Sequence, residues 1–164
     1  MLRAATEEDI SKVANIAKQN RKWLGFVMNV ALIEAVKKKS LYVYEENNEI
    51  IGFAHFHRRL DGWTTLHEIA VAKDHQQKGI GQQLLSVLET PVRLKTTIDN
   101  ENAVTFYKKF GFEHTRNEQG RKRELMVFEK FSPEPEIREK QILEVHLKLN
   151  KAKKIKKAKI TDIS

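Results

Sequence analysis

The feature that most constrains the fold is a pair of glycines at the point where a helix must begin. Residues 74–85 read DHQQKGIGQQLL, so Gly79 and Gly81 stand between a polar turn and an apolar run with helical spacing. Because a glycine inside a helix costs roughly 0.5–1 kcal/mol relative to alanine, something must compensate for both. Either a ligand needs the bare backbone of the first helical turn, or a tightly packed β-to-α turn leaves no room for side chains.

The apolar periodicity on both sides of this turn predicts one α/β domain over residues 1–131. Alternating strand-like and helix-like runs give the order β-α-α-β-β-β-α-β-α-β-β, which is typical of a mixed, mostly antiparallel sheet flanked by helices. Strands are expected at 2–5, in a hairpin at 41–59 with its turn at Asn47-Asn48, and at 62–72, 92–98, 111–115 and 123–131. Helices are expected after an N-cap at Thr6, at 22–39, from Gly79 to just before Pro91, and at 101–110.

The composition restricts the chemistry that is available. The chain has no cysteine, which excludes disulfides, a thiol nucleophile and cysteine-type metal sites. No run approaches eighteen apolar residues, and the acidic start lacks the apolar core of a signal peptide. We therefore expect no transmembrane segment and a cytoplasmic location.

The positive charge is concentrated in a predicted C-terminal basic helical extension, residues 132–164. Residues 148–164 hold seven lysines and one aspartate, which accounts for +6 of the chain's net charge of +8. The lysines from Lys148 to Lys159 suit contact with a polyanion such as nucleic acid, although a solvated helix end explains them equally well. An apolar stripe at 142, 145 and 149 indicates docking on the domain or on a second copy, as in a homodimer.

The glycine pair suits the binding of a diphosphate. The first amides of a helix have no intrahelical acceptor and carry a partial positive charge, so they attract anions. The spacing differs from the Walker G-x-x-x-x-G-K-[ST] and from the dinucleotide-binding G-x-G-x-x-G patterns, which argues against an NTPase or a dehydrogenase.

Two motifs in this order resemble the GNAT superfamily of acetyl-CoA-dependent N-acyltransferases. Gln76-x-x-Gly79-x-Gly81 is similar to the family's [QR]-x-x-G-x-[GA] motif. NENAVTFYKKFGF, which begins 19 residues after Gly81, resembles its N-x-x-A-x-x-F-Y-x-x-x-G-F signature at every marked position. The resemblance covers about residues 2–131 and implies a GNAT-like fold.

The resemblance also implies a set of cofactor-binding residues. Acetyl-CoA would be the co-substrate, its pantetheine arm lying in a splay between the strand at 62–72 and the strand at 92–98. The residues implied in its binding are Ile69, Ala70, Val71, Gln76, Gln77, Lys78, Gly79, Ile80, Gly81, Gln82, Asn100, Ala103 and Tyr107.

The same resemblance implies that Tyr107 protonates the departing thiolate. Attack of an amine on a thioester expels a thiolate, and a phenol at hydrogen-bond distance acts as a general acid toward it. The amide of Val71 would stabilise the tetrahedral oxyanion. By itself, Tyr107 is also explained as a core aromatic beside Phe106 and Phe110.

The residue that removes the amine proton is less clearly marked. Some relatives carry a glutamate or tyrosine at the position that corresponds to Thr65, which cannot serve as a base. His67 and Glu68 are the catalytic candidates in its place, and strand alternation puts them on opposite faces. His55 and His57 are second candidates, and a chain of waters is an alternative. The pair His55-x-His57 lacks a third ligand at a recognisable spacing, so no metal is expected.

The acceptor is a primary amine whose identity the sequence leaves open: a small molecule, a protein or a nucleic acid. Trp23 and Phe26, beside Arg21 and Lys22, either orient the substrate or form a hydrophobic plug. Transfer is expected to be direct, because no nucleophile for an acyl-enzyme is visible. The competing hypothesis is a non-catalytic CoA-binding module that associates with nucleic acid, for which the threonine at position 65 is the only support.

Overall fold

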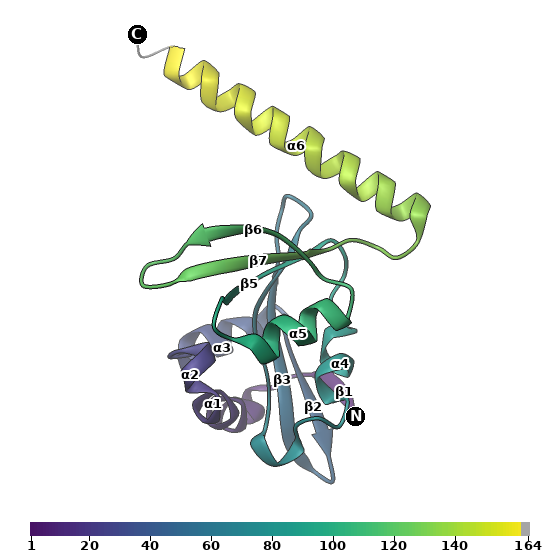
Figure 1. Ribbon diagram of the computed structural model, residues 1–164. Coiled ribbons are helices and arrows are strands. Elements are labelled where there is room, and N and C mark those ends of the chain that lie inside the picture. Colours follow the sequence, from purple (N-terminus) through teal and green to yellow (C-terminus); the bar gives the residue numbers. More distant parts are fainter. Residues whose placement is uncertain (162–164) are drawn as a thin grey trace.

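The architecture is a single seven-stranded sheet with helices on both faces, followed by one long helix (Figure 1). The computed structural model describes residues 1–161, with side chains to residue 157. The strands are β1 (Leu2–Ala4), β2 (Leu41–Glu46), β3 (Glu49–Arg58), β4 (Thr64–Val71), β5 (Val92–Thr97), β6 (Glu113–Gln119) and β7 (Glu124–Lys130). The helices are α1 (Ile10–Gln19), α2 (Arg21–Leu24), α3 (Asn29–Lys37), α4 (Ile80–Leu85), α5 (Glu101–Lys109) and α6 (Pro135–Thr161), with 3₁₀ turns at Glu7–Asp9 and Lys73–His75.

The strand order is β1-β2-β3-β4-β5-β7-β6, and β4–β5 is the only parallel pair in the described sheet. The predicted mixed, mostly antiparallel sheet is therefore confirmed. Residues of β3 alternate between the two faces, as strand geometry requires. Phe53 belongs to the core cluster under α1 and α3, whereas Phe56 belongs to the cluster under α4 and α5. The sheet thus separates two hydrophobic layers.

The start of the first helix is fixed by an ion pair with the edge strand. Arg3 of β1 donates to Asp9 through two guanidinium nitrogens at 2.7 and 3.0 Å, and the Thr6 amide donates to the same carboxylate at 2.8 Å. Chiefly because of the hydrogen bond from Arg3, the pKa of Asp9 falls to about 2. Downstream, Ile10, Val13, Ile16 and Ala17 are buried as predicted.

The segment 22–39, predicted to be one helix, forms two helices. α2 ends at Leu24 because Gly25 adopts a φ of +69°, a conformation that a helix cannot contain and that glycine tolerates. Residues 25–28 are extended or irregular before α3 begins at Asn29. The prediction was wrong because helical spacing of apolar residues on both sides of Gly25 hid the break.

Two further boundaries differ from the prediction. α4 ends at Leu85, although the apolar pattern extended the helix toward Pro91. Residues 116–120, which the polar sequence RNEQG places in a turn between the strands expected at 111–115 and 123–131, are mostly strand, because β6 continues to Gln119 and pairs with β7 as far as Glu124. β6 is an edge strand, and its largely exposed side chains lack the apolar alternation that marks a half-buried strand.

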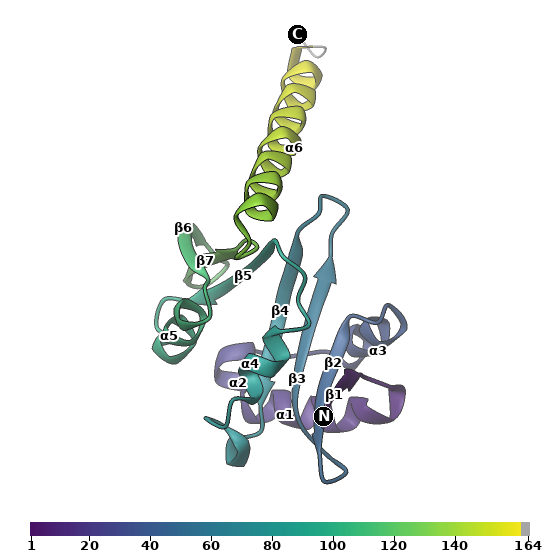
Figure 2. The same cartoon turned by 90° about the vertical axis from the view of Figure 1, so that its right-hand side faces the viewer.

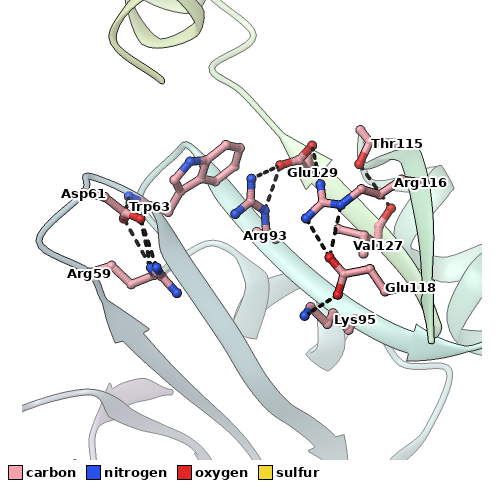
Figure 3. Close-up of polar contacts among 10 residues, drawn as sticks. All are labelled: Arg59, Asp61, Trp63, Arg93, Lys95, Thr115, Arg116, Glu118, Val127 and Glu129. Atoms are coloured by element: carbon pink, nitrogen blue, oxygen red, sulfur yellow. Dashed lines mark hydrogen bonds and ion pairs between the residues drawn. The ribbon is translucent and has the colours of Figure 1, made fainter. Parts of the chain in front are cut away.

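A polar network ties β5, β7 and β6 to the start of β4 (Figure 3). Arg93 of β5 lies over the ring of Trp63, with its guanidinium carbon 4.1 Å from the ring centroid. The same guanidinium donates twice to Glu129 of β7, at 2.6 and 2.8 Å. Arg93 therefore links β7, through a largely buried ion pair, to the residue that precedes β4, through the stacking on Trp63.

The long helix α6 follows the proline-containing segment SPEPE and leaves the end of the sheet, as Figure 1 shows. Ile142 and Val145 of the predicted apolar stripe are partly buried, whereas Leu149 is half exposed. Across the described residues, no helix combines the length and the apolar character needed to cross a membrane. The domain boundary near residue 131 stays a prediction.

We predict that Asp9→Asn destabilises the protein by about 2 kcal/mol at pH 7. The native pKa of Asp9 is about 2, below the ordinary 3.8, so its contribution is complete above pH 4 and is lost as the pH falls toward 2. Urea unfolding of both proteins at several pH values should therefore show a difference in unfolding free energy that is constant from pH 5 to 7 and shrinks below pH 4. Glu8→Gln, which changes an exposed neighbour, should unfold with the same free energy as the wild type. A difference for Asp9→Asn that does not depend on pH would contradict the stabilising role of the Asp9 carboxylate.

Candidate active site

The central feature of the site is an opening between β4 and β5. These strands pair over three positions, Thr64–Val92, Thr65–Arg93 and Leu66–Leu94. Beyond Leu66, β4 stays paired with β3, and β5 stays paired with β7. The two parallel strands consequently diverge toward the end of β4 (Figure 2), and the sheet opens there as the sequence resemblance implies.

The backbone of β4 faces this opening with unused donors. Ala72 donates its amide to Ile51 of β3 at 2.8 Å. In an antiparallel ladder the intervening residues turn their peptide groups to the other side, so the amides of Ile69 and Val71 are directed toward the gap. The Val71 carbonyl accepts from the side chains of Gln76 at 3.1 Å and Asn20 at 3.4 Å. The amides of Ile69 and Val71 thus remain available at this edge of β4.

The turn after β4 ends in Gly79, which precedes α4 and has a φ of +82°. A Cβ at Gly79 would meet no atom within 4 Å, so the space beside it is open. Gln77 also has a positive φ, of 63°, which makes this a tight, distorted turn. The amides that open α4 lack intrahelical acceptors, as at any helix start. The backbone at the start of α4 is therefore open on the side of Gly79.

The second glycine has a different role. A Cβ at Gly81 would lie 3.0 Å from Cζ of Phe106, the ring by which α5 approaches α4. Gly81 is therefore needed for packing between the two helices, which agrees with the alternative that a tightly packed turn leaves no room for a side chain. The prediction that both glycines clear space for a phosphate is wrong for Gly81, because its Cβ direction points into the protein.

Tyr107 lies in the aromatic core beneath α5. Its ring packs edge-on against Phe106 and Phe112, with centroids 5.4 and 5.5 Å away. It shares a hydrophobic cluster with Ile69 and Val71, the residues whose amides face the opening. Burial raises the pKa of Tyr107 above its ordinary value, so the phenol keeps its proton at neutral pH.

Asn100 caps α5. Its Oδ1 accepts from the Ala103 amide at 3.3 Å, so the oxygen is committed to the helix. The side-chain nitrogen has no hydrogen-bond partner among the described residues and is free to contact a ligand. The cap thus fixes the Asn100 side chain and leaves its nitrogen as an unused donor.

A β-bulge at His67 changes which face of the sheet the following side chains of β4 occupy. His55 pairs with Glu68 and Phe56 pairs with Leu66, which leaves His67 as an extra residue. Leu66 and Ile69 consequently lie on the same face although they are three residues apart, and both join the cluster under α4. The prediction that His67 and Glu68 lie on opposite faces is wrong, because the bulge brings both toward His55.

Three histidines and one carboxylate gather around this bulge. His55 Nδ1 lies 2.5 Å from Glu68 Oε2. The ring of His67 is 5.0 Å from that of His55 and 6.4 Å from that of His57. Partial desolvation, followed by the charges of the other two histidines, lowers the pKa of His67, against the opposing effect of Glu68.

The environments of the two base candidates differ. Glu68 is engaged by His55, whereas His67 is exposed and makes no hydrogen bond within the described chain. Within residues 1–157, no three acidic, histidine or cysteine side chains are placed to hold a metal ion. Of the two candidates, His67 is the proton acceptor that no other described residue engages in a hydrogen bond.

The segment between α1 and α3 forms a hollow of about 370 Å³ on the surface. Phe26 lines it and is 76% exposed, and Trp23 is 39% exposed. Arg21 lies over the ring of Phe26 and Lys22 over that of Trp23. The exposure of both rings contradicts the hydrophobic-plug alternative and leaves them available to a substrate.

Comparison with known proteins finds a family model that is similar to the central part of this chain. Residues 37–114 match the model of a family described as an acetyltransferase (GNAT) domain, a range that contains β4, the glycine turn and α5. No curated protein matches the chain.

Solved structures share the fold at low sequence identity. Ard1 from Thermoplasma volcanium has a TM-score of 0.73 at 20% identity, covering 82% of this chain and 98% of that one. A ribosomal-protein-alanine N-acetyltransferase from Brucella melitensis has a TM-score of 0.66 at 17% identity, covering 80% and 99%. Arabidopsis thaliana Naa50, in complex with the bisubstrate analogue CoA-Ac-MVNAL, has a TM-score of 0.66 at 19% identity, covering 80% and 98%.

We predict that Gly81→Val destabilises the unliganded protein by about 1–3 kcal/mol, because the new side chain overlaps Phe106. Urea unfolding measures the change. The double variant Gly81→Val/Phe106→Leu should recover part of the loss, since the shorter side chain removes the overlap. A single variant as stable as the wild type would contradict the packing role of Gly81.

Proposed function

We propose that this chain, whose residues 37–114 match the model of a GNAT acetyltransferase domain, transfers an acetyl group directly from acetyl-CoA to a primary amine. The observation that carries the proposal is the placement of Tyr107. A buried, neutral phenol shares a cluster with the two β4 residues whose amides face the opening in the sheet. In this proposal Tyr107 is the proton donor and the β4 amides are the oxyanion donors.

The residues around the gap fit a CoA thioester. Open space at Gly79 and the first amides of α4 suit the pyrophosphate, with Gln76 to Gln82 forming the surrounding turn. The backbone of β4 from Ile69 to Val71 suits a pantetheine arm that lies along it in the manner of an added strand. The unused side-chain nitrogen of Asn100 is a further donor toward it. When bound, acetyl-CoA supplies the activated acetyl group.

Each proton in the reaction has a candidate acceptor or donor. The amine nitrogen forms a bond to the acetyl carbon, and the Val71 amide donates to the oxygen that becomes negative. The carbon–sulfur bond then breaks, and Tyr107 protonates the thiolate. The nitrogen loses its extra proton to His67. The products are an N-acetylated amine and free CoA, and no acyl-enzyme forms.

We favour His67 over Glu68 as the proton acceptor. Its lowered pKa leaves the imidazole neutral at pH 7, and its ring has no hydrogen bond within the described chain. Glu68 is held by His55 and sets the position of that ring. The bulge puts His67 one residue beyond the last β4–β5 pair, at the start of the opening.

The α-amine of a peptide is the acceptor class to test first. Among the similar structures, one is a ribosomal-protein-alanine N-acetyltransferase and another holds a bisubstrate analogue of CoA and the sequence MVNAL. The exposed rings of Trp23 and Phe26, beside two cations, form a surface on which a peptide side chain can pack. Small amines and nucleosides belong in the same screen as competing acceptors.

We predict that Tyr107→Phe slows CoA release by about 10²-fold or more, because the leaving thiolate loses its proton donor. The assay incubates acetyl-CoA with a panel of peptides, polyamines and modified nucleosides and measures free thiol. Calorimetry should show unchanged affinity for acetyl-CoA, since the ring that packs in the core is retained. Binding of acetyl-CoA with no thiol release for any acceptor would favour a non-catalytic CoA-binding module, and undiminished turnover in Tyr107→Phe would exclude its acid role.

A second prediction concerns the acid limb of the pH–rate profile. If His67 accepts the proton, kcat/KM rises with pH through an inflection below 6.5, the ordinary value, because its pKa is lowered. His67→Gln should remove this inflection and reduce the rate at pH 7. His57→Gln, at a neighbouring exposed imidazole, should preserve the inflection. A profile unchanged by His67→Gln would assign the proton to Glu68 or to water.

A further inference from the structure

The basic end of α6 is held in a fixed direction relative to the domain. Gln141 donates to the Thr90 carbonyl at 3.0 Å and accepts from the Ser132 amide at 2.9 Å. Further along, Lys148 donates to the Asp61 carbonyl in the turn between β3 and β4, at 2.8 Å. After these contacts the helix continues away from the sheet, as Figures 1 and 2 show. The segment is therefore an anchored arm.

Beyond Lys148 the arm presents positive charge in all directions. Lys151, Lys153, Lys154 and Lys156 stand at roughly 0°, 200°, 300° and 140° around a helix that turns 100° per residue. The residues from 145 to 157 include no aspartate or glutamate. All described side chains from position 149 on are exposed. Lys159, part of the predicted basic segment, lies beyond the described side chains.

We propose that residues 149–157 of α6 bind the major groove of duplex DNA through its phosphates. An α-helix with its side chains is about 10–12 Å across, and the B-DNA major groove is about 12 Å wide with phosphates along both walls. A helix with lysines on every side can contact both walls at once. Between residues 149 and 157 the arm holds five lysines, one amide side chain, Asn150, and no arginine or glutamine, so its contacts are mainly with phosphates and little base reading is expected.

The other anionic partners fit this arm less well. A helix lying on a membrane needs an apolar face clear of charge, but Lys148 and Lys156 lie on the same side as Leu149 and Ala152. An acidic protein surface would contact one side of the arm and leave the opposite lysines unpaired. Duplex RNA has a deep and narrow major groove that a helix enters poorly.

The test uses the full chain and a fluorescein-labelled 20-base-pair DNA duplex, with binding followed by anisotropy at several salt concentrations. The arm variant carries Lys151→Gln, Lys153→Gln, Lys154→Gln and Lys156→Gln. We expect affinity to fall by about tenfold or more near 0.1 M salt, and the slope of log K against log salt to become shallower by about 2–4. A duplex of scrambled sequence should bind the wild type equally well.

A matched control variant carries Lys12→Gln, Lys37→Gln, Lys38→Gln and Lys39→Gln, four exposed lysines on α1 and at the end of α3. It changes the net charge equally and should bind the DNA within about threefold of the wild type. Circular dichroism of both variants verifies that helix content is retained. Equal loss in the two variants would overturn the proposal, since binding would then follow total charge.

Two other probes decide between partners. The wild type is also tested with a duplex RNA of the same length and with phosphatidylserine vesicles. If it binds either of them as tightly as DNA, or more tightly, the groove assignment is overturned. Thiol release with a small amine acceptor should be the same in the wild type and the arm variant. Loss of that activity together with DNA binding would show that the arm belongs to the catalytic domain, and would also overturn the proposal.

Discussion

The structure depends on the short pairing between β4 and β5. Three residue pairs join the two halves of the sheet, and each strand then follows its other neighbour. An uninterrupted ladder would consume the β4 amides that face the gap, whereas no ladder would let the halves separate. The stacking of Arg93 on Trp63 and its double hydrogen bond to Glu129 lie at the paired end. They stabilise the joint without closing the opening.

The two faces of the sheet offer opposite proton chemistry. Under α4 and α5, burial keeps the phenol of Tyr107 protonated, which suits a donor. On the other face, His67 is exposed and its pKa is lowered, which suits an acceptor. The two groups lie on opposite faces of the sheet. A thioester in the gap and an amine from the α1 side would each meet the group that it needs.

Much of this architecture follows from local sequence patterns. Apolar periodicity located most elements, and Asn47-Asn48 marked the hairpin turn, where both residues have positive φ. The opening itself came from the family resemblance, since periodicity gives no information about which strands separate. The bulge left a signal that could have been read: Leu66, Ile69 and Val71 are apolar, and the odd spacing between the first two requires an extra residue in the strand. The packing role of Gly81 had no local signal, because Phe106 lies 25 residues further along the chain.

The polar side chains of the edge strand β6 oppose association between copies of the molecule. As the last strand of the sheet, β6 leaves one row of backbone donors and acceptors without a neighbouring strand. Arg116 and Glu118 are charged, and Glu118 also binds Lys95 from β5. Adding a strand there would require these ions to be desolvated, which opposes edge-to-edge aggregation. The same residues that obscured β6 in the sequence thus protect the folded protein from open-ended polymerisation.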